Sequence, residues 1–143
     1  MKILAIKSSG DCTSISVILD DEINSYSQSH ERKERPDWNL FLANVGHKKL
    51  FSLKDIDLFA YANSQSSYTA TRTIASYMKG IAVGLNKPLM VVDDPDDDNL
   101  EADSIAKIAK EKFLSADSGH NYFDPNFANP SYLQETNFRK IDE

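Results

Sequence analysis

The sequence predicts an α/β domain built on a mixed five-stranded sheet with helices flanking it. Three observations lead to this prediction: three strand-like segments open the chain, helical and strand patterns alternate after them, and no stretch is apolar enough for a membrane span. The 143 residues, of which 41% are hydrophobic, suffice for one domain with a single core.

The first three segments are expected to form an antiparallel meander. The first contains a short apolar run, and the second alternates, with Ile15, Val17 and Leu19 on one face. The third is more polar, and short polar turns connect all three, as in β-hairpins. The expected strands cover residues 2–8, 13–19 and 22–29.

Helices and strands alternate in the rest of the chain. Pro36 and Asp37 are expected to open a helix, because proline fits the first turn and aspartate favours the positive end of the helix dipole. Four apolar residues of this helix share one face: Trp38, Phe41, Leu42 and Val45. The further expected elements are a strand at 56–62, a helix at 68–85, a strand at 88–92, a helix at 102–113 and a loop-rich tail after 115.

Three strands followed by helix, strand, helix, strand and helix are the plan of one ribonuclease-H-like lobe, the unit of the actin-like ATPase superfamily. We therefore expect this fold. The order of elements alone is a fold-level analogy, so function has to be argued from particular residues.

The net charge of −6 comes from one segment. Residues 93–103 hold seven acidic and no basic residues, and the rest of the chain has 16 basic and 15 acidic residues. No basic stripe of the kind that binds nucleic acid follows from this pattern. Asp94, Asp96 and Asp98 have the first spacings of a calcium loop, but Asn99 and Ile105 do not fit its glycine and glutamate positions. The segment is expected to be a solvated linker, with weak divalent-cation binding as the alternative.

The sequence predicts no catalytic, cofactor-binding or metal-ligating residues. His30, His47 and His120 are far apart, and no pair has the spacing of helix-borne metal ligands. Cys12 is the only cysteine, so an internal disulfide is excluded, and it is expected to be a small buried or half-buried thiol. No basic-then-apolar leader is present at the start, so the cytoplasm is the expected compartment.

The expected helix at 68–85 carries small residues at intervals of four: Ser76, Gly80 and Gly84. Each mid-helix glycine costs roughly 1 kcal/mol relative to alanine, so two of them need a packing reason. Small residues allow close approach either to the protein's own sheet or to a partner's helix. Both alternatives remain open from this pattern.

Several motifs resemble those of the TsaB (YeaZ) family, which acts in the threonylcarbamoyladenosine modification of tRNA. The spacing of the central motifs agrees with the family without gaps, and an opening and a closing motif agree as well. In order, the similar segments are 1–6 (MKILAI), 52–57 (SLKDID), 60–61 (AY), 67–72 (SYTATR), 80–84 (GIAVG), Pro88 and 130–134 (PSYLQ).

The chain also departs from the family pattern. Lys7 stands where the family has aspartate, and Arg35 stands where it usually has histidine. The family's glycine-rich loop is replaced by residues 62–67, with Ala70 after them. Because glycines let backbone amides approach a phosphate closely, no nucleotide cofactor is expected. The resemblance implies a first lobe at 1–93 and a shortened second lobe at 94–143, consisting of the acidic linker, one helix and a tail.

The resemblance implies a non-catalytic scaffold subunit that binds a TsaD-like catalytic subunit and a TsaE-like ATPase, with tRNA contacted only indirectly. TsaB proteins pair with TsaD through helices of the first lobe and self-associate through the same surface, so a homodimer is expected for the chain alone. The alternatives are a stand-alone homodimeric module and a glycoprotease-like or ATP-binding enzyme. The expected partner interface consists of Trp38, Phe41, Leu42, Val45, Thr73, Ser76, Tyr77, Gly80, Val83 and Gly84.

Overall fold

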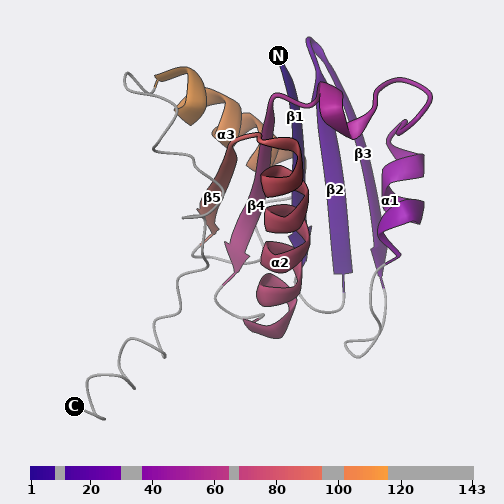
Figure 1. Cartoon of the computed structure of the whole chain (residues 1–143). Helices are drawn as coiled ribbons and strands as arrows, with labels where there is room; N and C mark the ends of the chain where they lie inside the picture. Colours follow the sequence, from indigo (N-terminus) through magenta and orange to yellow (C-terminus); the bar gives the residue numbers. More distant parts are fainter. Residues whose placement is uncertain (9–11, 30–36, 65–67, 95–101, 116–143) are drawn as a thin grey trace.

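One five-stranded sheet forms the centre of the molecule (Figure 1). Its strand order is β3-β2-β1-β4-β5, with β2 antiparallel to β1 and β3, and with β4 and β5 parallel to β1. The predicted mixed α/β sheet is therefore confirmed. The strands are β1 (Lys2–Ser8), β2 (Cys12–Leu19), β3 (Glu22–Ser29), β4 (Leu58–Ser64) and β5 (Leu89–Asp94). The computed structural model describes residues 1–8, 12–29, 37–64, 68–94 and 102–115.

Helices cover both faces of the sheet. One face packs against α1 and α2, and the other packs against α3 (Figure 1). A short 3-10 turn, η1, occupies the predicted connection before β4. The helical elements are α1 (Trp38–Asn44), η1 (Leu53–Asp55), α2 (Tyr68–Leu85) and α3 (Ala102–Ser115). No helix among these elements has the length and apolarity that crossing a bilayer would need.

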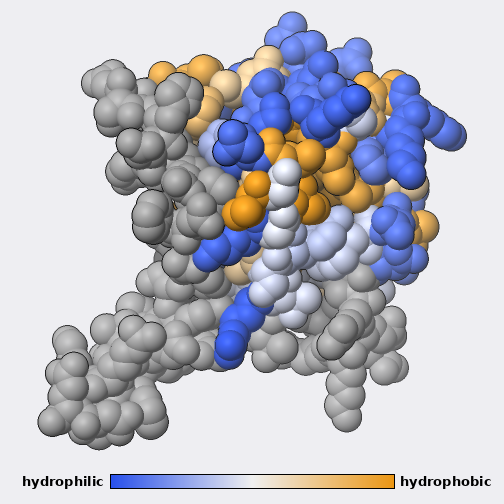
Figure 2. All heavy atoms as spheres, in the orientation of Figure 1, coloured by the Kyte–Doolittle hydropathy of each residue, from blue (hydrophilic) through white to orange (hydrophobic). Residues whose placement is uncertain are grey.

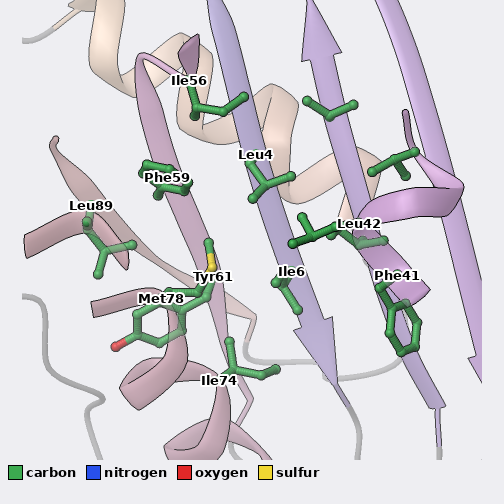
Figure 3. Packing of buried hydrophobic residues seen from close by; sticks show 14 of the residues in the cluster. Leu4, Ile6, Phe41, Leu42, Ile56, Phe59, Tyr61, Ile74, Met78 and Leu89 are labelled. Carbon is green, nitrogen blue, oxygen red and sulfur yellow. The ribbon is translucent and has the colours of Figure 1, made fainter. Parts of the chain in front are cut away.

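Strand alternation divides the core into two clusters. Leu4 and Ile6 of β1 face α1 and α2, whereas Ile3 and Ala5 face α3. Figure 3 shows how side chains from the strands, α1 and α2 meet in the first cluster. On the inner side of the long helix, Ile74 and Met78 are fully buried. On the second side the buried residues of α3 are Ala102, Ile105, Ala106 and Ala109.

The ends of α1 and α2 follow from local chemistry. Asp37, which is expected to open this helix, is the N-cap of α1, and its carboxylate accepts a hydrogen bond from the Leu40 amide at 3.3 Å. Asn86, with φ of 56°, terminates α2. Its amide donates to the Val83 carbonyl at 3.2 Å, and the Lys87 amide donates to the Ala82 carbonyl at 2.9 Å. These two bonds form a Schellman motif.

Two local expectations are corrected by the structure. Cys12 is exposed and not buried or half-buried; it is the first residue of β2, and the six residues that follow it are buried. The apolar pattern of α1 extends to Val45, but the helix ends at Asn44. Gly46, with φ of 105°, lies in the following turn, in a conformation that a helix does not allow.

Candidate partner-binding surface

The two sides of α2 differ in size and exposure of their residues. Thr71, Ile74, Ala75, Met78 and Ala82 are buried against the sheet. The opposite side is exposed. It carries Arg72, the valine Val83, which is 45% exposed, and otherwise small residues. We call the five uncharged residues of this side the α2 surface; they are Thr73, Ser76, Gly80, Val83 and Gly84.

The two glycines of the α2 surface face open space. A Cβ atom added at Gly80 or at Gly84 would meet no atom of the described chain within 4 Å. Close packing on the protein's own sheet is therefore excluded as the reason for these glycines. They cost the helix about 1 kcal/mol each relative to alanine, and nothing in the described part of the molecule compensates that cost locally. The described residues therefore give no packing reason for these two glycines.

An aromatic pair fixes one border of the α2 surface. The rings of Trp38 on α1 and Tyr77 on α2 stack at a centroid distance of 4.6 Å and an interplanar angle of 13°. The ring centroid of Phe41 lies 6.1 Å from that of Trp38. Phe41 also meets the ring of Tyr26 edge-on, at a centroid distance of 5.2 Å. Burial raises the pKa of the Tyr77 hydroxyl, so this ring stays neutral at physiological pH. The stack offers a rigid, half-buried aromatic contact, which is typical of interface anchors.

Three of the predicted interface residues are not on the surface. Phe41, Leu42 and Val45 are each at most 2% exposed and belong to the protein's own core. The helical periodicity of α1 is as predicted, but its apolar face is turned toward the sheet (Figure 3). The expectation of an exposed apolar patch on α1 is therefore wrong for these three residues. Trp38 and Tyr77 are partly buried, and the five residues of the α2 surface are exposed.

The α2 surface contains no charged residue, although Arg72 is exposed next to it. The helix carries Arg72 and Lys79 and no acidic residue in its 18 residues. Figure 2 shows near-neutral side chains along this helix and apolar atoms gathered over its C-terminal half, with hydrophilic side chains around them. A weakly charged centre with a polar surround is the usual composition of a protein–protein contact.

Among the described residues, no cluster of side chains suits metal binding. No group of three or more histidine, cysteine or acidic residues lies close enough to hold a metal ion within these ranges. Burial, and secondarily the charge of Lys48, lowers the pKa of His47, whose ring packs against Phe51 at 5.7 Å. His30, His120 and most of the acidic segment lie outside the described residues. Lys7 is buried at the end of β1.

The fold and this surface together describe a ribonuclease-H-like lobe with an exposed small-residue helix. Among solved structures, the chain is similar to YeaZ from Pseudomonas aeruginosa, with a TM-score of 0.60 and 18% identity over 65% of this chain and 44% of that one. A second structure, an uncharacterized protein with similarity to peptidase YEAZ from P. aeruginosa, matches with the same score and identity over 65% of this chain and 43% of that one.

These matches show a shared fold, and the chain spans less than half the length of either structure. The family named by the sequence motifs and the family named by these structures are the same. No protein-family model matches the chain, and no curated protein matches it significantly.

Proposed function

We propose that the chain is a non-catalytic partner subunit that docks its α2 surface onto a helix of a TsaD-like protein, and supports that protein in threonylcarbamoyladenosine modification of tRNA. The observation that carries the proposal is the open space at Gly80 and Gly84. Gly80 lies within the 18-residue helix and Gly84 in its last turn. Glycine is a poor helix former, and exposed glycines are useful where another backbone must come close.

The surroundings of the glycines support docking of a helix. The exposed positions 73, 76, 80, 83 and 84 recur every three or four residues, so they form one continuous stripe along α2. Helices pack at axis separations of about 8–10 Å, and small residues in the seam permit the shorter separations. The Trp38–Tyr77 stack borders the stripe and supplies apolar area. The resemblance of the sequence motifs to the TsaB family, with which the YeaZ-like fold agrees, supports a TsaD-like protein as the proposed partner.

The substitution Gly80→Leu tests this proposal. The added side chain has open space in the free protein, so the melting temperature should stay unchanged or rise slightly. In a docked complex the leucine would separate the two helices. We expect the Kd for the host's TsaD-like protein, measured by calorimetry, to rise by at least about 100-fold.

Lys112→Leu is the matched control, because it places the same side chain on the exposed side of α3. This variant should bind the TsaD-like protein as the wild type does. Wild-type affinity of the Gly80→Leu variant would overturn docking through α2. Absence of binding by the wild-type chain would overturn the proposed partner and leave a stand-alone module.

A further inference from the structure

Charged residues are distributed unevenly between the helices on the two faces of the sheet. The helices α1 and α2, which share one face (Figure 1), carry Arg72 and Lys79 and no acidic residue. The helix α3 on the other face carries both signs, with Asp103 and Glu111 beside three lysines. The sequence has a net charge of −6 but contains no acidic residue from Leu58 to Val92. Thus α2 is a positively charged helix on a protein that is negatively charged as a whole.

The two basic residues of α2 lie in one line beside the α2 surface. Arg72 and Lys79 are seven residues apart, which is close to two helical turns, so their side chains leave the helix in nearly the same direction, about 10 Å apart along its axis. Arg72 is exposed and Lys79 is partly buried. We call these two residues the basic row. Ser76 and Val83 of the α2 surface follow them by four residues each and are their direct neighbours on the helix.

The basic row and the aromatic stack border opposite sides of the α2 surface. Tyr77, which stacks on Trp38, precedes Lys79 by two residues, so the two side chains point about 160° apart around the helix axis. Gly80 lies between these two directions, about 100° from Lys79 and about 60° from Tyr77. A helix docked on the α2 surface therefore meets an aromatic flank on one side and a positively charged flank on the other.

We propose that the helix of the TsaD-like protein that docks on the α2 surface carries carboxylates on the flank that faces the basic row. This inference rests on the proposed function and specifies the chemistry of the partner. Small residues in the seam let the two helix axes come close, which brings side chains on the partner's flank within reach of the basic row. Carboxylates there would form charge-assisted hydrogen bonds, and the guanidinium of Arg72 suits two-pronged binding of a carboxylate.

The two unlike flanks also determine the direction in which the partner helix docks. A helix that is acidic on one flank exchanges its flanks when its direction is reversed. In the reversed direction its carboxylates would face the apolar rings of Trp38 and Tyr77, where they would lose hydration without gaining a cationic partner. Complementary charge acts in this way mainly on orientation, specificity and the rate of association. The basic row is therefore a specificity-determining feature of the α2 surface.

Charge reversal tests this inference by calorimetry with the host's TsaD-like protein at about 150 mM salt, where distant charges are screened beyond about 8 Å. Arg72→Glu/Lys79→Glu should raise the Kd at least about 30-fold, and the milder Arg72→Gln/Lys79→Gln at least about fivefold. The matched control Lys107→Glu/Lys112→Glu makes the same charge change at exposed positions of α3 and should alter the Kd less than about threefold. Equal effects of the two charge-reversal variants would overturn the inference.

Salt dependence separates charge from shape in the same complexes. Between about 50 mM and about 500 mM salt, the Kd of the wild type should rise at least about tenfold, because salt screens the attraction. The Kd of Arg72→Glu/Lys79→Glu should stay constant or fall, because in this variant salt screens a repulsion. A wild-type Kd that does not depend on salt would contradict an acidic flank on the partner.

Carbodiimide cross-linking tests the contact directly, because this reagent joins a lysine amine to a carboxylate that lies against it. Mass spectrometry of the wild-type complex should find Lys79 joined to an aspartate or glutamate of the TsaD-like protein. Lys79→Arg keeps the positive charge and should keep the Kd within about twofold, but it should lose this cross-link. A complex that is weakened by Gly80→Leu yet gives no cross-link at Lys79 would overturn the acidic flank and leave docking through α2 intact. A wild-type chain that does not bind the TsaD-like protein would overturn both.

Discussion

The helices α2 and α3 cover opposite faces of the same sheet, and their outer sides differ in chemistry. Both bury small and medium apolar residues against the strands. The outer side of α3 is charged, with Lys107, Glu111 and Lys112 exposed. The outer side of α2 consists mainly of glycine, serine and threonine. The inner sides of both helices pack on the same sheet and are therefore both apolar. The outer sides have no such common constraint and can differ.

The difference separates a helix with a charged outer side from one whose outer side we propose to be a docking surface. Lysine and glutamate are good helix formers and favour water, so α3 gains stability and solubility from its outer side. Glycine at positions 80 and 84 gives α2 neither benefit. The cost of these glycines is understandable when the contact that compensates it lies outside the chain. This comparison is the physical basis of the proposed partner role.

The largest expected effect tests the assignment of α1 residues to the core beneath α2. Phe41→Ala should lower the free energy of unfolding by about 3–5 kcal/mol, because it removes a fully buried ring from the cluster under α1 and α2. Leu114→Ala on the outer side of α3 should change it by less than about 0.5 kcal/mol, since Leu114 is 64% exposed. Urea denaturation measures both. A change of less than about 1 kcal/mol in the free energy of unfolding for Phe41→Ala would argue that Phe41 is not part of the core. It would also weaken the distinction between the inner and outer sides of the helices.

A smaller effect of opposite sign is expected on the outer side of α2. The double variant Gly80→Ala/Gly84→Ala should raise the free energy of unfolding by up to about 2 kcal/mol, because alanine is the better helix former and its methyl group has open space. The same methyl groups would lie in the docked seam, so affinity for the partner should fall. Thermal melts and partner titrations of one preparation separate the two effects. Lys107→Ala on α3 is the control, and an equal gain there would remove the contrast between the helices.

The sequence predicted the strands and the long helices because their patterns are strong. The face of β2 that carries Ile15 and Val17 is buried as the alternation predicts, although the structure buries the opposite face of β2 as well. The 3.6-residue period of α2 specifies one buried face, and the structure buries it. The extent of α1 was less predictable, because the turn at Gly46 ends the helix before the apolar pattern ends. Element identity thus followed from periodicity, whereas element ends depended on single backbone conformations.

The candidate surface was only partly predictable for a related reason. Periodicity places Phe41, Leu42 and Val45 on one face but does not say whether that face meets the protein's own sheet or a partner. The spacing of Gly80 and Gly84 left the same two alternatives. Tertiary packing resolves both: the residues of α1 are buried, and the glycines of α2 are open. The Trp38–Tyr77 stack joins two helices and can be read only from the three-dimensional structure.

The smallest expected effect concerns Asp55, a surface carboxylate that is held by hydrogen bonds. It can be compared with the exposed charges on the outer side of α3. The Asp55 carboxylate accepts hydrogen bonds from the Ser52 amide at 2.9 Å and the Ser52 hydroxyl at 3.0 Å. The hydrogen bond from the Ser52 backbone, and to a smaller extent the one from its side chain, lowers the pKa of Asp55 below its usual 3.8. The group contributes stability that is complete above the unfolded-state pKa and is lost as the pH falls through the folded-state value.

Asp55→Asn keeps an oxygen that can accept these hydrogen bonds and removes only the charge. Its melting temperature should therefore lie slightly below that of the wild type at pH 7, and the difference should disappear as the pH falls below 3.8. Glu111→Gln on the outer side of α3 removes a charge from an exposed helical position, where surface substitutions have small effects. Melting curves of the three proteins between pH 7 and pH 2 make the comparison. If the melting temperature of Asp55→Asn lies below that of the wild type by the same amount at every pH, the charge of Asp55 does not contribute to stability. If Glu111→Gln lowers the melting temperature more than Asp55→Asn does, the charges on α3 also stabilise the fold.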